Sequence, residues 1–196
     1  MPIIIEDGRG SGISAGVNLD NRLLTKAISS TTLEDASFDG FSYSVDIGTV
    51  TLTTAGESGL LSIKNTDPNL MLQISSVVFG IGKSNIAGDV IIKGYSNVTT
   101  GTLISGGSSV TPTNRNYGLS TPAIATVLKG SEGSTITNGT QSATFIVQSP
   151  SALEVDSTVV LPNGYSIALS VTPPSGNTSM KVSILARIFY FNPKST

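Results

Sequence analysis

Six residues near the start of the chain have the spacing of a phosphate-binding loop. Residues 10–15, GSGISA, fit the G-x-G-x-x-G/A fingerprint, in which glycines let the backbone approach a pyrophosphate. An apolar run at residues 3–5 precedes them, and Glu34 and Asp35 follow at about the distance of a ribose-binding carboxylate. A dinucleotide site also requires further parallel βαβ units. Everything after residue 40 alternates with a period of two, so we interpret residues 8–16 as part of an arm.

Paired carboxylates are the second group that could do chemistry. Acidic pairs occur at Glu6-Asp7, at Glu34-Asp35 and at Glu154 and Asp156, and the last two could share one face of a strand. The chain has no His and no Cys, so it lacks the usual general base and the thiolate metal ligands. Adjacent acids in loops are usually only solvated. We therefore expect a protein that is not an enzyme and has no cofactor and no metal.

The charge balance limits the partners. Eleven Lys and Arg against thirteen Asp and Glu give a net charge of −2, and the basic residues form no run. Nucleic-acid binding depends on clustered cations that neutralise phosphates, so we expect no nucleic-acid partner. No stretch approaches the roughly 20 apolar residues of a membrane helix, so we expect no membrane partner.

The elements that must position these residues are short strands. From Tyr43 onward apolar residues alternate, and the alternation shifts at Gly48 and at Ser75-Ser76, which predicts two β-bulges. Residues 29–39 are expected to form a loop, and residues 102–104 a strand. Pro162-Asn163-Gly164 predicts a turn that joins a hairpin, and the strand at 180–191 is apolar on both faces.

Eight to ten such strands, with no convincing helix after residue 40, predict an all-β fold. We expect an antiparallel β-sandwich with a jelly-roll-like topology over residues 41–196. Residues 1–40 are expected to form an extended, glycine-rich N-terminal arm, in which residues 17–28 fit a helix and a strand equally well. We expect this arm to contact another subunit through seven residues: Ile3, Ile4, Ile5, Arg9, Leu19, Leu23 and Leu24.

Three stretches resemble a family of tailed-bacteriophage virion proteins. One joins NRLLTKAISST (21–31) to GTVTLTTAGESGLLSIKNTDPNLMLQISSVVFGIGKS (48–84), and another is PPSGNTSMKVSI (173–184). The third is NRNYGLSTPAIATVLKGSEGSTITNGT (114–140), where the family has an N-x-N-x-G-S segment and then a K-G-x-E-G-x-T-x-x-G turn. Here Leu119 separates Gly118 from Ser120. The matching positions are Asn114, Asn116, Gly118, Ser120, Lys129, Gly130, Glu132, Gly133, Thr135 and Gly139.

The resemblance implies a structural part of a virion, assembled in the bacterial host cytoplasm. We expect a capsid decoration or cement protein that bridges subunits of the major capsid protein or other virion proteins, as a homo-oligomer and preferably a trimer. Two alternatives remain open. One is a tail or fibre component, and the other is a carbohydrate-binding surface module that uses four tyrosines: Tyr43, Tyr95, Tyr117 and Tyr165.

Overall fold

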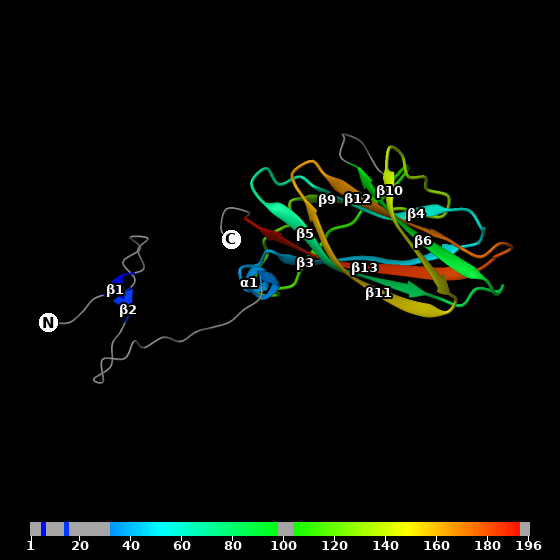
Figure 1. Cartoon of the computed structure of the whole chain (residues 1–196), viewed down its shortest axis with the longest axis horizontal. Helices are drawn as coiled ribbons and strands as arrows, with labels where there is room; N and C mark the ends of the chain where they lie inside the picture. The colour runs from blue at the N-terminus through cyan, green and yellow to red at the C-terminus, as the bar shows by residue number, and fades with distance from the viewer. Residues whose placement is uncertain (1–4, 7–13, 16–31, 98–103, 193–196) are drawn as a thin grey trace. The chain divides into compact units, whose positions relative to one another are not determined.

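The computed structural model describes residues 5–6, 14–15, 32–97 and 104–192. The chain divides into two compact units, residues 1–31 and residues 32–196. In the first unit, strand β1 (Ile5–Glu6) pairs antiparallel with β2 (Ser14–Ala15). The second unit holds one short helix and two antiparallel sheets that lie face to face as a β-sandwich (Figure 1).

Each sheet has one long edge strand at one end and a two-residue strand at the other. Sheet I has the order β11 (Ser151–Leu161), β5 (Met71–Ile81), β13 (Met180–Phe191), β3 (Ser42–Leu52) and β8 (Thr113–Asn114). Sheet II has the order β10 (Thr140–Gln148), β6 (Asp89–Asn97), β12 (Ser166–Thr172), β4 (Ser58–Asn65), β9 (Ala125–Lys129) and β7 (Ser108–Ser109). All described strand pairs are antiparallel.

The alternating apolar residues build the core between the sheets, because successive side chains of a strand face opposite ways. Both predicted bulges are confirmed. Gly48 has φ +64°, and the β3–β13 register shifts there, so that two residues of β3 lie opposite Ile184. Ser75 is the extra residue of β5 between its pairs with β13. Each bulge keeps the apolar residues on both sides of it facing inward.

The expected loop at 29–39 is wrong over its described part, because Thr32–Phe38 forms helix α1. The helix ends in a Schellman motif: the Phe41 N–H donates to the Ala36 carbonyl at 2.6 Å, and Gly40 has φ +77°. Helix α1 contacts β13 and β3. It therefore belongs to the same unit as the sandwich, at the end of β13 where Phe189 on the outer face is buried.

The expected hairpin around Pro162–Gly164 is also wrong. The turn itself is present, since the Tyr165 N–H donates to the Pro162 carbonyl at 3.1 Å and Gly164 has φ +84°. However, β11 before the turn pairs with β5 in sheet I, and β12 after it pairs with β4 and β6 in sheet II. Turn chemistry specifies a reversal of the chain but not the partner of each strand. The segment is an arch between the two sheets.

The strand expected at 102–104 is not a ladder in its described part. Residues 102–103 lie outside the described residues, and Ile104 makes an isolated bridge with Ile136. All but one of the connections between consecutive long strands pass from one sheet to the other. The remaining connection, from β6 to β10, starts and ends in sheet II and includes β7, β8 and β9.

Candidate functional site

The two sides of the sandwich, where the sheet edges face each other, are built differently. On one side the segment from β7 to β8 passes from sheet II to sheet I, and we call this side the closed flank. On the other side lie the edge strands β10 and β11, joined through Ser149-Pro150 at one end. We call this side the open flank.

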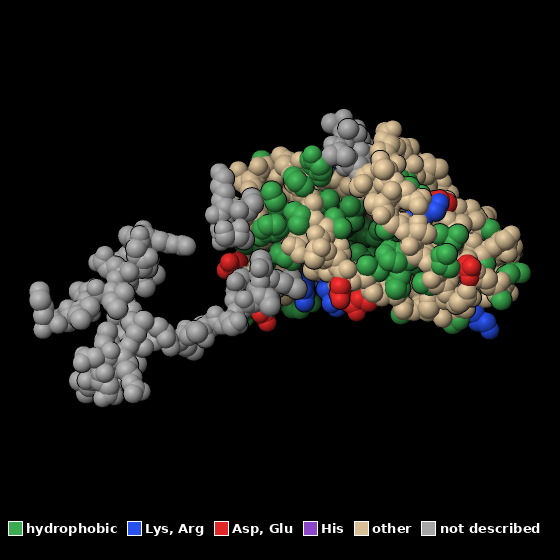
Figure 2. All heavy atoms as spheres, in the orientation of Figure 1, with side chains coloured by type: hydrophobic (Ala, Val, Ile, Leu, Met, Phe, Trp, Pro, Cys, Tyr) green, Lys and Arg blue, Asp and Glu red, His purple; other side chains and the backbone are tan. Residues whose placement is uncertain are grey.

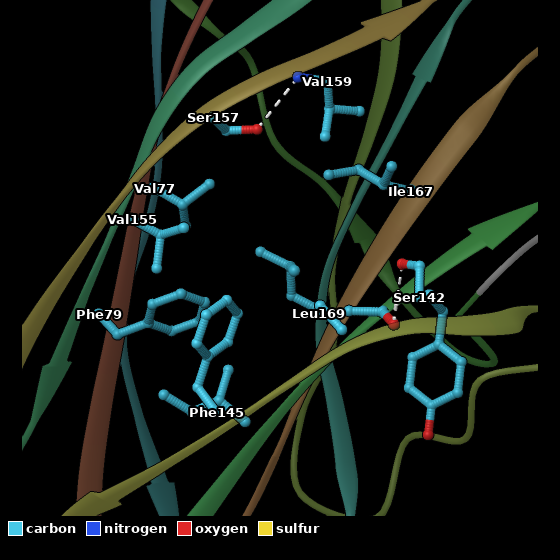
Figure 3. A pocket seen from close by; sticks show the side chains of 13 residues that line it. Val77, Phe79, Ser142, Phe145, Val155, Ser157, Val159, Ile167 and Leu169 are labelled. Carbon is cyan, nitrogen blue, oxygen red and sulfur yellow. Dashed lines mark hydrogen bonds between the residues drawn. The ribbon is translucent and has the colours of Figure 1, made fainter.

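The open flank contains an apolar groove with a cavity volume of about 230 Å³. Figure 3 shows its side chains converging from both sheets, among them Phe79 on β5 and Phe145 on β10. In Figure 2 the same region is a hollow surrounded by hydrophobic side chains. The lining residues are Val77, Phe79, Ile92, Gly94, Tyr95, Ser142, Ala143, Phe145, Val155, Ser157, Val159, Ile167 and Leu169.

The floor of the groove is core, and its rim is only half covered. Phe79 on β5 is 2% exposed and Ile92 on β6 is fully buried. The inward-facing residues of the edge strands, such as Phe145 and Val155, are half-buried, and Val159 is 42% exposed. A cavity of this size and lining accepts apolar side chains and offers few polar partners. The groove therefore suits a protein segment better than a polar small molecule.

The outer faces of the two edge strands differ in charge. Strand β11 presents Glu154, whose carboxylate lies 3.6 Å from the Arg187 guanidinium, and the exposed Asp156. Strand β10 contains no charged residue, and its Ile146 is 64% exposed. Charged residues on an edge strand discourage pairing with another chain. The β10 edge has no such protection.

A second, polar hollow of about 250 Å³ lies on the outer face of sheet II around Glu57. The Glu57 carboxylate accepts hydrogen bonds from the Lys93 ammonium at 2.8 Å, the Tyr95 hydroxyl at 2.6 Å and the Ser170 hydroxyl at 2.7 Å. Burial raises the pKa of Glu57, but the hydrogen bonds from Lys93, Tyr95 and Ser170 outweigh it, so that the pKa lies below its ordinary value. The carboxylate is ionised at neutral pH, and both of its oxygens already have partners.

The last two residues of the nucleotide-like loop lie in a strand. Ser14 and Ala15, its last two residues, form strand β2, where a dinucleotide site needs the start of a helix. Glu34 and Asp35 lie on helix α1, and Glu154 is paired with Arg187. The described part of the chain brings none of these acids into a group of three or more metal-ligating residues.

Of the seven expected arm contacts, Ile5 lies in β1, opposite Ala15. The other six, Ile3, Ile4, Arg9, Leu19, Leu23 and Leu24, lie outside the described residues. The four tyrosines proposed for carbohydrate binding do not form one surface. Tyr43 is 1% exposed and belongs to the core, whereas Tyr117 is 90% exposed and only Tyr95 lines the polar hollow.

The residues that resemble the virion family hold the closed flank together. The Asn114 side chain donates to the carbonyls of Gly40 and Thr121, and its oxygen accepts from the Asn116 N–H. Glu132 accepts from Thr53 N–H at 2.5 Å, and the other contacts of its carboxylate are with the Thr53 hydroxyl and with Thr54. These motif positions therefore carry structural roles in this chain.

No direct signal in the sequence marks the open flank, because the groove depends on which strands become edges. The absence of charge over residues 140–148 is the one local feature that marks the β10 edge.

Among the described residues no helix is long and apolar enough to cross a membrane. Searches against protein-family models and against curated proteins found no match for this chain.

Proposed function

We propose that this protein is a non-enzymatic structural component of a tailed-phage particle. Its role would be that of a capsid decoration protein, which bridges the subunits of the major capsid protein and stabilises the head. The observation that carries the proposal is the open flank, where an apolar groove lies beside an uncharged strand edge. Exposed apolar surface of this kind marks a protein contact.

The strand order supports a jelly-roll topology, which is common among capsid proteins. The long strands of sheet I run β3, β13, β5 and β11 from the closed to the open flank, and those of sheet II run β4, β12, β6 and β10. Consecutive long strands thus alternate between the sheets, except that β6 and β10 share sheet II. The last two strands, β12 and β13, lie inside sheets whose edges are formed by earlier strands. This is the arrangement of two interleaved Greek keys.

The composition also supports a structural role in an assembled particle. Only 12% of residues are charged, and the sequence is rich in Ser, Thr, Asn and Gly. The resemblance to virion proteins rests on turn motifs that tie the closed flank. Those motifs argue for the shared fold, and the open flank argues for association with other virion proteins.

Imaging of intact particles of the phage that encodes this sequence tests the proposal. We expect copies at regular positions on the shell, as trimers or another symmetric oligomer. Density only on the tail would replace the decoration role with the alternative of a tail or fibre component. A particle that contains no copy would overturn both.

A truncated chain sharpens the same test. We expect removal of residues 1–20 to weaken particle binding while the sandwich keeps its thermal unfolding transition. The reason is that the deleted residues belong to the first unit and the core to the second. Normal decoration by the truncated chain would remove the arm from the proposal.

A carbohydrate-binding role is a second candidate, favoured by the polar hollow. Tyr95 offers an aromatic face and Glu57 an ionised carboxylate, which are groups that bind sugar rings and hydroxyls. A glycan array separates the candidates. Binding that is lost in Tyr95→Ala would support this role, and an array without hits would dismiss it.

A further inference from the structure

Strand β10 is an edge strand that lacks the usual protection against pairing. No described strand pairs with its outer edge. Its sequence TQSATFIVQ has no charge and no Pro, and the register shift at Ser142 leaves residues 143–148 regular. Natural edge strands are usually protected by charge, Pro or a bulge along their length. The regular part of β10 is therefore a template for one more strand.

The strand that fits this edge must be apolar on both faces. Its inward side chains would enter the groove beside Phe145 and Ala143. Its outward side chains would lie next to Ile146, which is 64% exposed and has an uncharged strand around it. Strand β11 would offer Glu154 and Asp156 to an outward side chain instead. The β10 edge is the better match for an apolar strand.

Residues 3–5 of this chain have that composition. In an extended segment Ile3 and Ile5 share one face and Ile4 has the other. Ile5 already lies in a strand, but its partner β2 contributes only two residues. An isolated two-stranded ladder is marginal in water, and a third strand stabilises it. Pairing with a free sheet edge would therefore stabilise the β1–β2 pair.

The connecting chain is long enough to reach the groove of a second copy as well as its own. Residues 6–31 separate Ile5 from helix α1 and reach about 85 Å when extended. Helix α1 contacts β13, which is separated from β11 at the open flank only by β5. That step is about 10 Å along the sheet. A connection to the chain's own groove needs only a small part of this length.

We infer that residues 3–5 of a second copy of this chain add to the outer edge of β10, with Ile3 and Ile5 in the groove. This inference rests on the proposed function, because it names the partner of the open flank. It makes the contact between copies reciprocal or cyclic, since each chain supplies one arm and one edge. Closed symmetry then follows when the last arm reaches the first edge.

Engineered cysteines test the inference cleanly, because the chain contains none of its own. An affinity-tagged full-length Ile5→Cys protein is mixed with untagged full-length Ala143→Cys protein and oxidised mildly. We expect a covalent hetero-dimer that carries one tag. The matched control is Thr51→Cys on β3, an exposed position away from the open flank, which should give no enriched hetero-dimer.

The outcomes separate the inference from the proposed function. A crosslink that forms only within one Ile5→Cys/Ala143→Cys double variant, with none in the mixture, would overturn exchange in favour of the chain's own arm. Equal crosslinking at positions 143 and 51 would overturn the site. Both results leave particle imaging unaffected, whereas particles without the protein alongside a positive crosslink would overturn only the proposed function.

Discussion

The gap between the two sheets is covered on one flank of the sandwich and left as a groove on the other. On the closed flank, polar turns and the segments from β7 to β8 and from β8 to β9 join the sheets. The Val110 N–H donates to the Val127 carbonyl at 3.0 Å, and the Arg115 N–H donates to the Ser42 carbonyl at 2.8 Å. On the open flank, the half-buried side chains of β10 and β11 face a groove of about 230 Å³. The chain covers its own core on one side and leaves an apolar groove on the other.

This difference separates stability from association within one molecule. Substitutions that displace the packed backbone of the closed flank should destabilise the domain, because backbone groups there have no alternative partners. Substitutions on the rim of the open flank should leave the domain folded and change what binds to it. The four predictions that follow test this separation, beginning with the largest expected loss of stability.

The first prediction concerns Gly130 on the closed flank. A Cβ atom at this position would lie 1.8 Å from the Gly59 carbonyl oxygen, which is backbone and cannot rotate away. We expect Gly130→Ala to lower the free energy of unfolding by about 3 kcal/mol or more, measured by urea denaturation. The control is Gly118→Ala, where the nearest atom is 3.4 Å away and the change should stay within about 0.5 kcal/mol. Equal stability of the two variants would contradict the prediction.

The second prediction compares two phenylalanines of the groove. Phe79 is 2% exposed and forms the floor, so Phe79→Ala should cost about 3–5 kcal/mol of stability. Phe145 is half-buried at the rim, so Phe145→Ala should cost only about 1–2 kcal/mol. Self-association measured by light scattering should nevertheless fall in Phe145→Ala. If that variant unfolds as readily as Phe79→Ala, the rim belongs to the core and the comparison fails.

The sequence predicted the parts of this fold that depend on local pattern. The period-two alternation indicated the sandwich, and the shifts at Gly48 and Ser75 indicated the bulges, because a bulge restores the inward face after one extra residue. Helix α1 was not predicted, because its seven residues show too little periodicity to stand out. The clearest signal of this helix in the sequence is Gly40, the glycine that follows its C-terminal end.

The open flank could not be predicted, since it depends on strand order. The turn at Pro162–Gly164 was expected to join neighbours in one sheet, but it joins β11 in one sheet to β12 in the other. Nothing in the local sequence distinguishes a hairpin from an arch. Tyr43, one of the four tyrosines available to the carbohydrate-binding alternative, lies in the core, as its alternation with Val45 and Ile47 indicates.

The third prediction concerns pH and the closed flank. Hydrogen bonds from Thr53, and then from Thr54, hold the pKa of Glu132 below its ordinary value of 4.5. The unfolded chain therefore takes up the proton first, so this stabilisation is present above about pH 4.5 and is lost as the pH falls through the folded-state pKa. Glu132→Gln should remove this part of the acid destabilisation.

The size of the effect is small, because Glu132 is close to solvent. We expect Glu132→Gln to lose less than about 1 kcal/mol at pH 7 and to lose less stability than the parent between pH 5 and 3. Thr53→Val removes one donor and should shift the acid transition in the same direction, by less. Parallel melting-temperature curves for all three proteins over this range would contradict the assignment.

The fourth prediction is the smallest in stability and the most specific for association. Ile146 is 64% exposed on the outer face of β10, so Ile146→Lys should change the free energy of unfolding by no more than about 0.5 kcal/mol. A lysine there places a charge beside the incoming Ile4 and protects the edge as charged edge strands are protected elsewhere. Self-association should fall at least tenfold in sedimentation experiments.

The matched variant is Ala152→Lys, which adds the same charge to the exposed face of β11, the other edge of the same groove. It should associate like the parent, because the arm pairs with β10 and does not contact the outer edge of β11. If Ala152→Lys weakens association and Ile146→Lys does not, the arm adds to the β11 edge instead. If neither does, the open flank is a static hollow, and the contrast between the flanks reflects folding alone.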